Sequence, residues 1–184
     1  MRKIVFVTGN EYKFQVAVEA LKPYGIELEQ IRLETPEIQS TKVEDVAGFS
    51  AKWVSEKLDR PAVLTDAGYY IQALCGFPGP FIKWVNSWLT AENYVKLMEG
   101  KVDRKIVVKE CLAYCEPGKE PVVFVGEFVG QMAEKVGAKG TTPINEVFIP
   151  EGFDRVESEI SREEMVKFWG TSGNWQKLGE YLKI

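Results

Sequence analysis

The chain has 184 residues, a formal net charge of −4, and 45% hydrophobic residues. This length and composition are typical of one globular domain with a substantial core, and they exclude a largely disordered chain. The acidic balance argues against a nucleic-acid partner, while a local basic pocket for a small anion remains open. No stretch approaches the roughly 18 consecutive apolar residues of a membrane span, so we expect no membrane partner.

The chain lacks histidine and contains three cysteines, Cys75, Cys111 and Cys115. The absence of histidine excludes His-ligated metals, His-dependent nucleophiles and histidine general bases. Acid–base chemistry must then rest on carboxylates, Lys, Tyr or Cys, and a divalent metal would be a hard one bound by oxygens. An odd cysteine count without a C-x-x-C pair favours a reducing compartment, and no signal peptide is visible. We expect a cytoplasmic protein.

The first part of the chain predicts strands and helices in alternation. Residues 3–7 form an apolar run typical of a buried strand, and Asn10 can cap the helix that follows. Four apolar side chains share one face of that helix: Phe14, Ala17, Val18 and Leu21. A second strand is expected over residues 26–33. Thr41 with Glu44 then fits a capping box that opens a second helix.

The rest of the chain continues this pattern. Residues 62–66 predict a third strand, and the long segments 105–114 and 122–132 predict a hairpin. Helices are expected after the turn-rich GFPGP segment and near the C-terminus. The order β-α-β-α-β, followed by helices and a hairpin, predicts a single α/β domain over residues 1–184 with a mixed, strongly twisted sheet.

The segment VTGNEYK joins the first strand to the first helix. A strand that runs through a glycine turn into a helix presents backbone N–H groups that bind anions, phosphates above all. Lys13 falls in the first helical turn, where the macrodipole disfavours cations, and a bound phosphate would offset that placement. The alternative is a solvated surface lysine, since the segment is neither a Walker A loop nor a G-x-G-x-x-G fingerprint. The candidate phosphate contacts are Thr8, Gly9, Asn10 and Lys13.

A second lysine has the same placement. In GFPGPFIKW, two glycines allow unusual backbone angles and two prolines stiffen the loop, and Lys83 then falls in the first turn of the next helix. Two lysines that each follow a glycine loop favour a polyphosphate ligand. The aromatic side chains nearby are expected to pack in the core or in a dimer contact rather than on a base: Phe77, Phe81, Trp84 and Trp88.

Two carboxylates stand after predicted strands. Asp66 ends the third strand, where ligands of open α/β sheets gather, and the small residue Ala67 follows it. Glu37 lies in the loop segment PEIQ after the second strand. Taken alone, each could have no part in binding or catalysis: Asp66 could cap a turn, and Glu37 could be an ordinary loop residue. Together they could converge on one cation, because two carboxylates and a triphosphate are what a Mg²⁺ site usually contains.

Four segments in this order, FVTGNEYK, PEIQ, LTDAG and GFPGPFIKW, resemble the inosine triphosphate pyrophosphatase (Ham1-like) family. The resemblance covers most of the chain and is densest over residues 3–100. It implies hydrolysis of non-standard purine nucleoside triphosphates, such as ITP, dITP and XTP, to the monophosphate and pyrophosphate. It also implies an elongated mixed sheet flanked by helices, two lobes with a central nucleotide cleft, Mg²⁺ dependence and usually a homodimer.

The resemblance also implies roles for residues that match the family's motifs. Glu37 and Asp66 would bind the metal. Asp66 would also activate the attacking water, and Lys13 would act with it in catalysis. The substrate would be bound by Thr8, Gly9, Asn10, Lys13, Ala67, Lys83 and Asn145.

The departures from the family's pattern concern mainly the groups that read the base. The family usually has two acids before the turn after the third strand, and here the first is Thr65. By alignment, Thr142 replaces an aromatic residue, Asn145 an aspartate and Met165 a lysine, and KFWGTSGNW stands where a Ser-His-Arg element is usual. Losing the groups that read a 6-keto purine should weaken discrimination by orders of magnitude unless others replace them. Trp169, Asn145 or Thr142 could form a different base pocket, or Trp169 could simply pack in the terminal helices.

The leading hypothesis is therefore a Mg²⁺-dependent nucleoside triphosphate pyrophosphatase with altered base preference. A nucleotide-binding protein that has lost catalysis is an alternative, favoured by the missing acid at Thr65. A hydrolase of another phosphorylated metabolite, using the same phosphate clamp, is a third. The sequence does not specify the base, the sugar, the oligomeric state or whether activity is retained.

Overall fold

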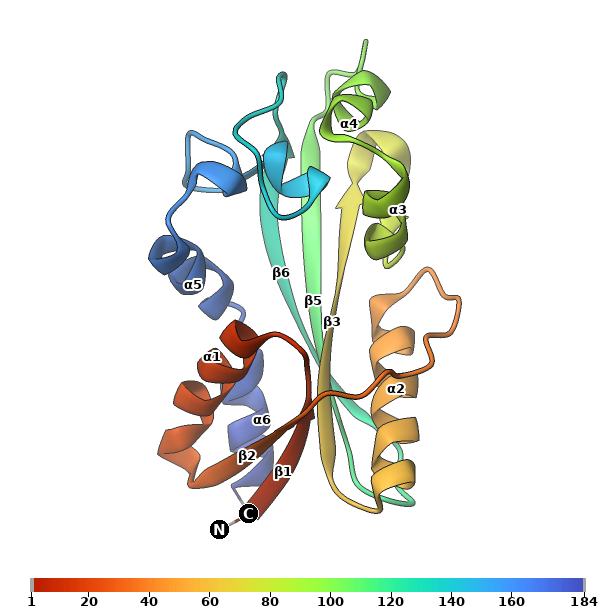
Figure 1. The fold of residues 1–184 in the computed structure, drawn as a ribbon, viewed down its shortest axis with the longest axis vertical. Coiled ribbons are helices and arrows are strands. Elements are labelled where there is room, and N and C mark those ends of the chain that lie inside the picture. The colour runs from red at the N-terminus through yellow and green to blue at the C-terminus, as the bar shows by residue number, and fades with distance from the viewer. Residues whose placement is uncertain (1, 184) are drawn as a thin grey trace. The chain divides into compact units, whose positions relative to one another are not determined.

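The computed structural model describes residues 2–183, except for the side chains of Arg2 and Tyr12. Its strands form one seven-stranded sheet in the order β2-β1-β3-β5-β6-β7, with β4 paired to β3 (Figure 1). The strands are β1 (Arg2–Val7), β2 (Ile26–Ile31), β3 (Ala62–Ile71), β4 (Pro78–Gly79), β5 (Lys105–Cys115), β6 (Val122–Met132) and β7 (Phe148–Pro150). Pairs β1–β2 and β1–β3 are parallel, while β3–β4 and β6–β7 are antiparallel. The predicted mixed α/β sheet is confirmed.

Six α-helices accompany the sheet over the described residues. They are α1 (Glu11–Leu21), α2 (Val43–Leu58), α3 (Ile82–Trp88), α4 (Ala91–Leu97), α5 (Arg162–Gly170) and α6 (Asn174–Leu182). The chain divides into two compact units. Unit 1 contains the chain up to Asp66, residues 110–126 and the chain from Ser172 onward; unit 2 contains residues 67–109 and 127–171. Strands β3, β5 and β6 therefore contribute residues to both units.

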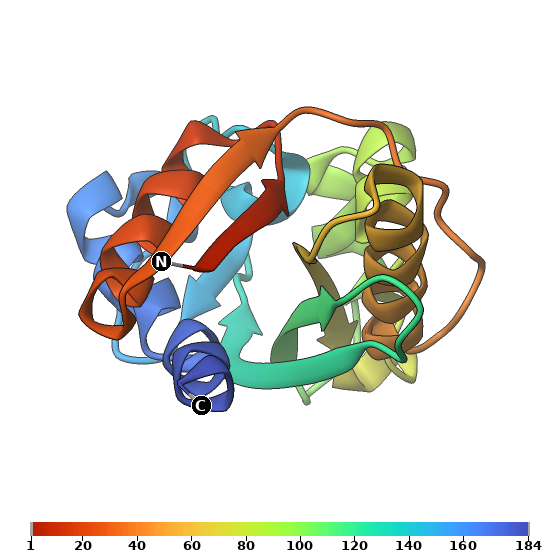
Figure 2. The same ribbon diagram turned by 90° about the horizontal axis from the view of Figure 1, so that it is seen from below.

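The sheet of unit 1 is covered by helices on both faces (Figure 2). Alternate side chains of a strand point to opposite faces. Accordingly, Ile4 and Phe6 of β1 pack with α1 and α6, whereas Val5 and Val7 pack with α2. The apolar face predicted for α1 is confirmed, because Ala17 and Leu21 of that face are buried in the first of these clusters and Phe14 and Val18 pack against it.

The start of α2 corrects one prediction. The helix begins at Val43, and its N-cap residue is Lys42, which makes no side-chain cap. The Thr41–Glu44 capping box is therefore wrong. The physical reason is a competing local turn: the Ser40 hydroxyl accepts from the backbone N–H of Lys42 (3.1 Å) and donates to Asp45 (2.8 Å), which organises the entry to the helix in another way.

Unit 2 has its own core around α3, α4 and the short strand β7. Tyr94 of α4 and Phe148 of β7 are fully buried there, and Trp169 of α5 packs against the same cluster. The Thr90–Asn93 capping box opens α4, and Ser161 with Glu164 opens α5 in the same way. Lys83 lies in the first turn of α3, as predicted.

Two further features bear on the setting of the protein. Cys75, Cys111 and Cys115 are all free thiols. Within residues 2–183, no helix is long and apolar enough to cross a lipid bilayer. The cytoplasmic location stays a prediction, since neither observation tests it.

An ion-pair cluster ties together the first parallel strands of unit 1. The Glu29 carboxylate on β2 accepts from Arg60 (2.8 Å) and lies 3.2 Å from the Lys3 ammonium on β1. The hydrogen bond from Arg60, followed by that from Lys3, lowers the pKa of Glu29 to about 2. A carboxylate with a lowered pKa contributes stability above its unfolded-state pKa and loses it as the pH falls through the folded-state value.

We therefore expect Glu29→Gln to melt at a lower temperature than the wild type at pH 7. The difference should shrink as the pH falls from about 4.5 toward 2, because the wild-type carboxylate is then protonated as well. The effect should be modest, since all three side chains are partly exposed. Thermal unfolding followed by circular dichroism across this pH range measures it, with the exposed Glu27→Gln on the same strand as control. A deficit of equal size at both ends of the range would contradict the ion-pair account.

Candidate active site

The loop after β1 is held in place by its own polar side chains. The Asn10 side-chain oxygen accepts from the backbone N–H of Lys13 (3.2 Å), which confirms the predicted helix cap. The Thr8 hydroxyl accepts from the backbone N–H of Asn10 (3.1 Å). Thr8 is also fixed to β2, because its backbone N–H donates to Ile31 (3.1 Å) and its carbonyl accepts from Gln30 (3.2 Å). The N-terminus of α1 is thus positioned at the end of β1.

Gly9, in the middle of this loop, has space around it. A Cβ atom built at Gly9 would meet no atom within 4 Å, and its φ is not in the left-handed region. The fold of the chain itself therefore does not require a glycine at this position. The open space lies beside the first-turn N–H groups of α1, where an anion is stabilised by the helix macrodipole.

Lys13 is turned toward the sheet rather than freely solvated. Its side chain is half-buried, and its ammonium donates to the Thr65 hydroxyl on β3 at 3.5 Å. A lysine in the first turn of a helix is unfavourable without a nearby negative group. The contact with β3 brings the ammonium to the strand that carries Asp66, so the surface-lysine alternative does not describe this side chain.

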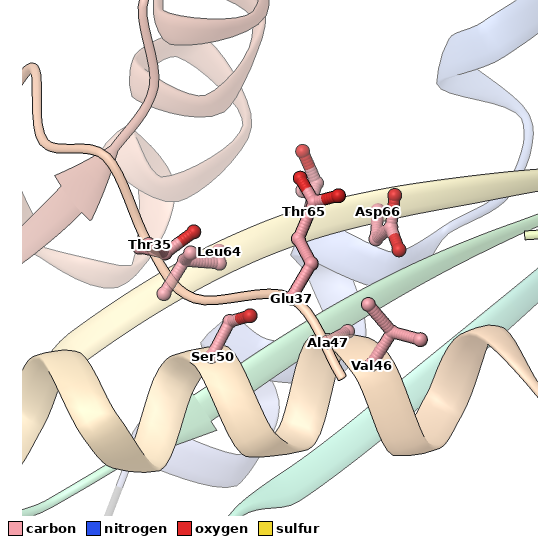
Figure 3. Close-up of a pocket in the computed structure, with 8 residues that line it drawn as sticks. All are labelled: Thr35, Glu37, Val46, Ala47, Ser50, Leu64, Thr65 and Asp66. Atoms are coloured by element: carbon pink, nitrogen blue, oxygen red, sulfur yellow. The ribbon is translucent and has the colours of Figure 1, made fainter. Parts of the chain in front are cut away.

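Glu37 and Asp66 line one small pocket of about 60 Å³ (Figure 3). Glu37 reaches it from the loop between β2 and α2, and Asp66 reaches it from β3. The full lining is Thr35, Glu37, Val46, Ala47, Ser50, Leu64, Thr65 and Asp66. The predicted convergence of the two carboxylates is present in the structure. Because Thr65 both lines the pocket and accepts from Lys13, the acidic pocket adjoins the residue that binds the Lys13 ammonium.

The donor set of this pocket suits a hard divalent cation. A single water needs roughly 10–15 Å³ of such volume, so the pocket has room for an ion with waters still attached. Mg²⁺ keeps several waters and binds through one or two carboxylates plus substrate phosphates. Over residues 2–183, no cluster of three or more acidic, cysteine or histidine side chains could hold a metal ion. Two carboxylates therefore fit a cation that is completed by substrate and water.

Three of the predicted substrate-binding residues belong to unit 2. Ala67 follows Asp66 directly and opens that unit. Lys83 is exposed on α3, with its ammonium 5.5 Å from the centre of the Trp84 ring. Asn145 lies in a short helical turn before β7.

Asn145 belongs to a hydrogen-bonded network built around Glu157. Its amide donates to Glu157 (2.7 Å), and its side-chain oxygen accepts from the hydroxyls of Thr142 (2.5 Å) and Thr141 (3.0 Å). The side chains of Trp169 and Tyr69 also hydrogen-bond to Glu157. Burial raises the pKa of Glu157, and these hydrogen bonds oppose that shift. Glu157 was not singled out from the sequence, because nothing in the segment VESE distinguishes it from the second glutamate, Glu159.

Trp169 packs against aromatic side chains, and Met165 is buried. The Trp169 ring packs edge-on against Phe128 (4.7 Å between centres) and Phe168 (4.9 Å). Met165, which stands where the family usually has a lysine, is buried in α5. The packing alternative for Trp169 is therefore present, together with its hydrogen bond to Glu157. Asn145 and Trp169 both hydrogen-bond to the half-buried Glu157 carboxylate, and Thr142 hydrogen-bonds to Asn145.

Comparisons with known proteins identify the family of the chain. The model of the Ham1 family matches residues 4–168. The dITP/XTP pyrophosphatase of Methanopyrus kandleri is 37% identical over 98% of this chain and 96% of its own length. That of Methanosarcina acetivorans is 43% identical over 79% of this chain and 81% of its own. A solved HAM1 protein from Coxiella burnetii has the same fold, with a TM-score of 0.83 at 20% identity, over 99% of this chain and 98% of that one.

The family match spans most of the chain, and the two relatives exceed 30% identity over more than two thirds of it. The loop after β1 and the acidic pocket lie within the matched region. The chain belongs to the Ham1 family.

Proposed function

We propose that the chain is a Mg²⁺-dependent nucleoside triphosphate pyrophosphatase that releases the nucleoside monophosphate and pyrophosphate, with a base preference that differs from its relatives. The observation that carries the proposal is the pocket lined by both Glu37 and Asp66, which adjoins Lys13 through Thr65. Relatives named dITP/XTP pyrophosphatase support the reaction class. A cation held by oxygens suits a chain without histidine.

The residues of unit 1 have separate tasks in this reaction. The N–H groups at the start of α1, with Thr8 and Asn10, would bind phosphate oxygens. Lys13 would neutralise the charge that develops on the leaving pyrophosphate. Glu37 and Asp66 would hold the cation, which when bound supplies charge neutralisation on the phosphates. Asp66 would also accept the proton of a water aligned for attack on the α-phosphorus.

A panel of nucleoside triphosphates tests this assignment. We expect pyrophosphate release in the presence of Mg²⁺, and Asp66→Asn should lower kcat by about 100-fold or more, as for the loss of a general base. Asp59→Asn is the matched control, because Asp59 caps α2 in the left-handed conformation that asparagine also tolerates. Release of orthophosphate would favour the alternative hydrolase. A thermal shift without turnover would favour a binding protein that has lost catalysis.

The same panel tests base preference. The Asn145–Glu157 network carries polar groups that are satisfied by one another, and Met165 brings no positive charge. We therefore expect the preference for ITP and XTP over ATP and GTP in kcat/KM to stay below the roughly 10⁴-fold that sites built on substrate hydrogen bonds achieve. A preference of that size would show that another group reads the 6-keto purine.

Gly9 provides a test of phosphate binding that is independent of folding. Because a Cβ at this position meets no atom of the chain, Gly9→Ala should leave the melting temperature within a few degrees of the wild type. If the substrate's phosphates approach the backbone here, the added methyl group should raise KM by about tenfold or more. Gly170→Ala, at a helical position equally free of contacts, is the control. Unchanged kinetics in Gly9→Ala would place the phosphates elsewhere.

We also propose that the chain forms a homodimer through an aromatic patch of unit 2. Trp88 is 71% exposed and Trp84 50% exposed on α3, and Phe77 in the preceding loop is exposed as well. Exposed patches of this kind mark interaction sites. Light scattering should give the mass of a dimer for the wild type and of a monomer for Trp84→Lys/Trp88→Lys. Val102→Lys, at a nearly fully exposed position of the same unit, should stay dimeric. A monomeric wild type would contradict this.

A further inference from the structure

Thr65 stands where the family usually has an acid, and the structure offers a carboxylate from a neighbouring strand instead. We propose that Glu110 on β5 supplies this charge and positions Lys13 for the phosphates of the substrate. Glu110 is a positioning residue in this account, since it acts through the lysine. The inference rests on the proposed function and names a residue of the same site.

Strand geometry places Glu110 and Thr65 on one face of the sheet. On β3, Val63 packs with α1 and α6, so Thr65, two residues on, points to that face. On β5, Leu112 packs with the same helices, so Glu110 points there too. The strands β3 and β5 are neighbours in the sheet. An acid at either position therefore faces the same helices.

Contacts with Lys13 support this placement. The Lys13 ammonium donates to the Thr65 hydroxyl (3.5 Å), and its positive charge acts on the Glu110 carboxylate. Burial raises the pKa of Glu110, while the charge of Lys13 and hydrogen bonds from Ser172 and Asn174 oppose this shift. A half-buried carboxylate is costly to desolvate unless a positive charge compensates it, and Lys13 is the cation that acts on Glu110.

Asn174 holds this part of β5 in place, although its own side-chain oxygen is left unpaired among the described residues. Its side chain is 1% exposed, its amide donates to the Glu110 carbonyl (3.0 Å), and it also hydrogen-bonds to the Glu110 carboxylate. Its own side-chain oxygen finds no hydrogen-bond partner among the described residues. An unpaired buried acceptor costs about 1–3 kcal/mol. Such costs persist mainly where a group serves a function, here the fixed orientation of Glu110.

A double-mutant cycle separates positioning from a purely structural role. Glu110→Gln removes the charge but keeps an acceptor for Ser172 and Asn174. We expect it to lower kcat about tenfold with little change in KM, because Lys13 is still present but less well placed. Lys13→Met should cost more. Adding Glu110→Gln to Lys13→Met should then change kcat less than twofold. An equal loss in both backgrounds would overturn the inference, since Glu110 would act independently of Lys13.

A second test moves the carboxylate from β5 to the neighbouring strand β3. Thr65→Glu combined with Glu110→Gln places an acid beside the same ammonium, and we expect it to recover most of the lost kcat. Thr65→Gln with Glu110→Gln is the uncharged match and should recover none. Equal activity of the two double variants would overturn the inference. Glu29→Gln, which removes a carboxylate paired elsewhere in unit 1, should leave kcat unchanged while lowering stability.

The inference can fail separately from the proposed function. A wild type without turnover on every nucleotide would refute the proposed function alone. Calorimetric titration with inorganic tripolyphosphate then decides the role of Glu110. We expect Glu110→Gln to change the dissociation constant at least threefold when Lys13 is present and not in Lys13→Met. Equal effects, or no effect, in both backgrounds would overturn the inference without reference to activity.

Discussion

The side-chain alternation of β3 is the constraint on which the candidate site depends. Thr65 and Asp66 are neighbours in sequence, so they point to opposite faces of the sheet. Thr65 meets Lys13 on the face covered by α1 and α6, and Asp66 lines the pocket on the face covered by α2. The Thr65 hydroxyl that binds Lys13 and the Asp66 carboxylate are thus on opposite faces of one strand.

This separation depends on rigid anchors on both faces. On one face, Asn10 caps α1 and so fixes the backbone from which Lys13 extends. On the other, the Ser50 hydroxyl of α2 donates to the carbonyl of Pro36 (3.2 Å) and holds the loop that carries Glu37. Groups held by packing and hydrogen bonds act with less reorganisation than groups on free loops. The site is therefore built largely before any ligand arrives.

Local patterns predicted those parts of the fold in which one interaction dominates. The apolar spacing from Phe14 to Leu21 gave the buried face of α1, because helical geometry leaves few other arrangements. The Thr41–Glu44 box misplaced the start of α2, whose N-cap residue is Lys42, and the Ser40 hydroxyl binds the Lys42 N–H and the Asp45 carboxylate there. When several polar side chains precede a helix, the sequence does not decide which one organises its start.

The same distinction applies to the site. Glu37 and Asp66 could be predicted as a pair, although the expectation that Asp66 ends its strand was wrong: β3 runs from Ala62 to Ile71, so Asp66 lies inside it. Glu110 could not, since its surroundings come from residues about 60 positions later in the chain, Ser172 and Asn174. Glu157 was missed for a related reason: its donors include Tyr69 on β3, almost 90 residues earlier. Acids that become significant through long-range burial leave no local signal.

The two half-buried acids also differ in the charge around them. The positive charge of Lys13 acts on Glu110 and favours its ionised form. Glu157 is surrounded by neutral donors from Asn145, Trp169 and Tyr69. Three donors satisfy most of a carboxylate's hydrogen-bonding capacity, and the Asn145 oxygen already accepts from two threonines. Because these hydrogen bonds are nearly complete, the network stabilises unit 2 without a ligand. Few of its polar groups would lose a hydrogen-bond partner when a wrong base binds. Strong discrimination requires polar groups that only the right substrate can satisfy. The phosphate half of the proposed site is therefore the part whose chemistry is specified most fully by the chain itself.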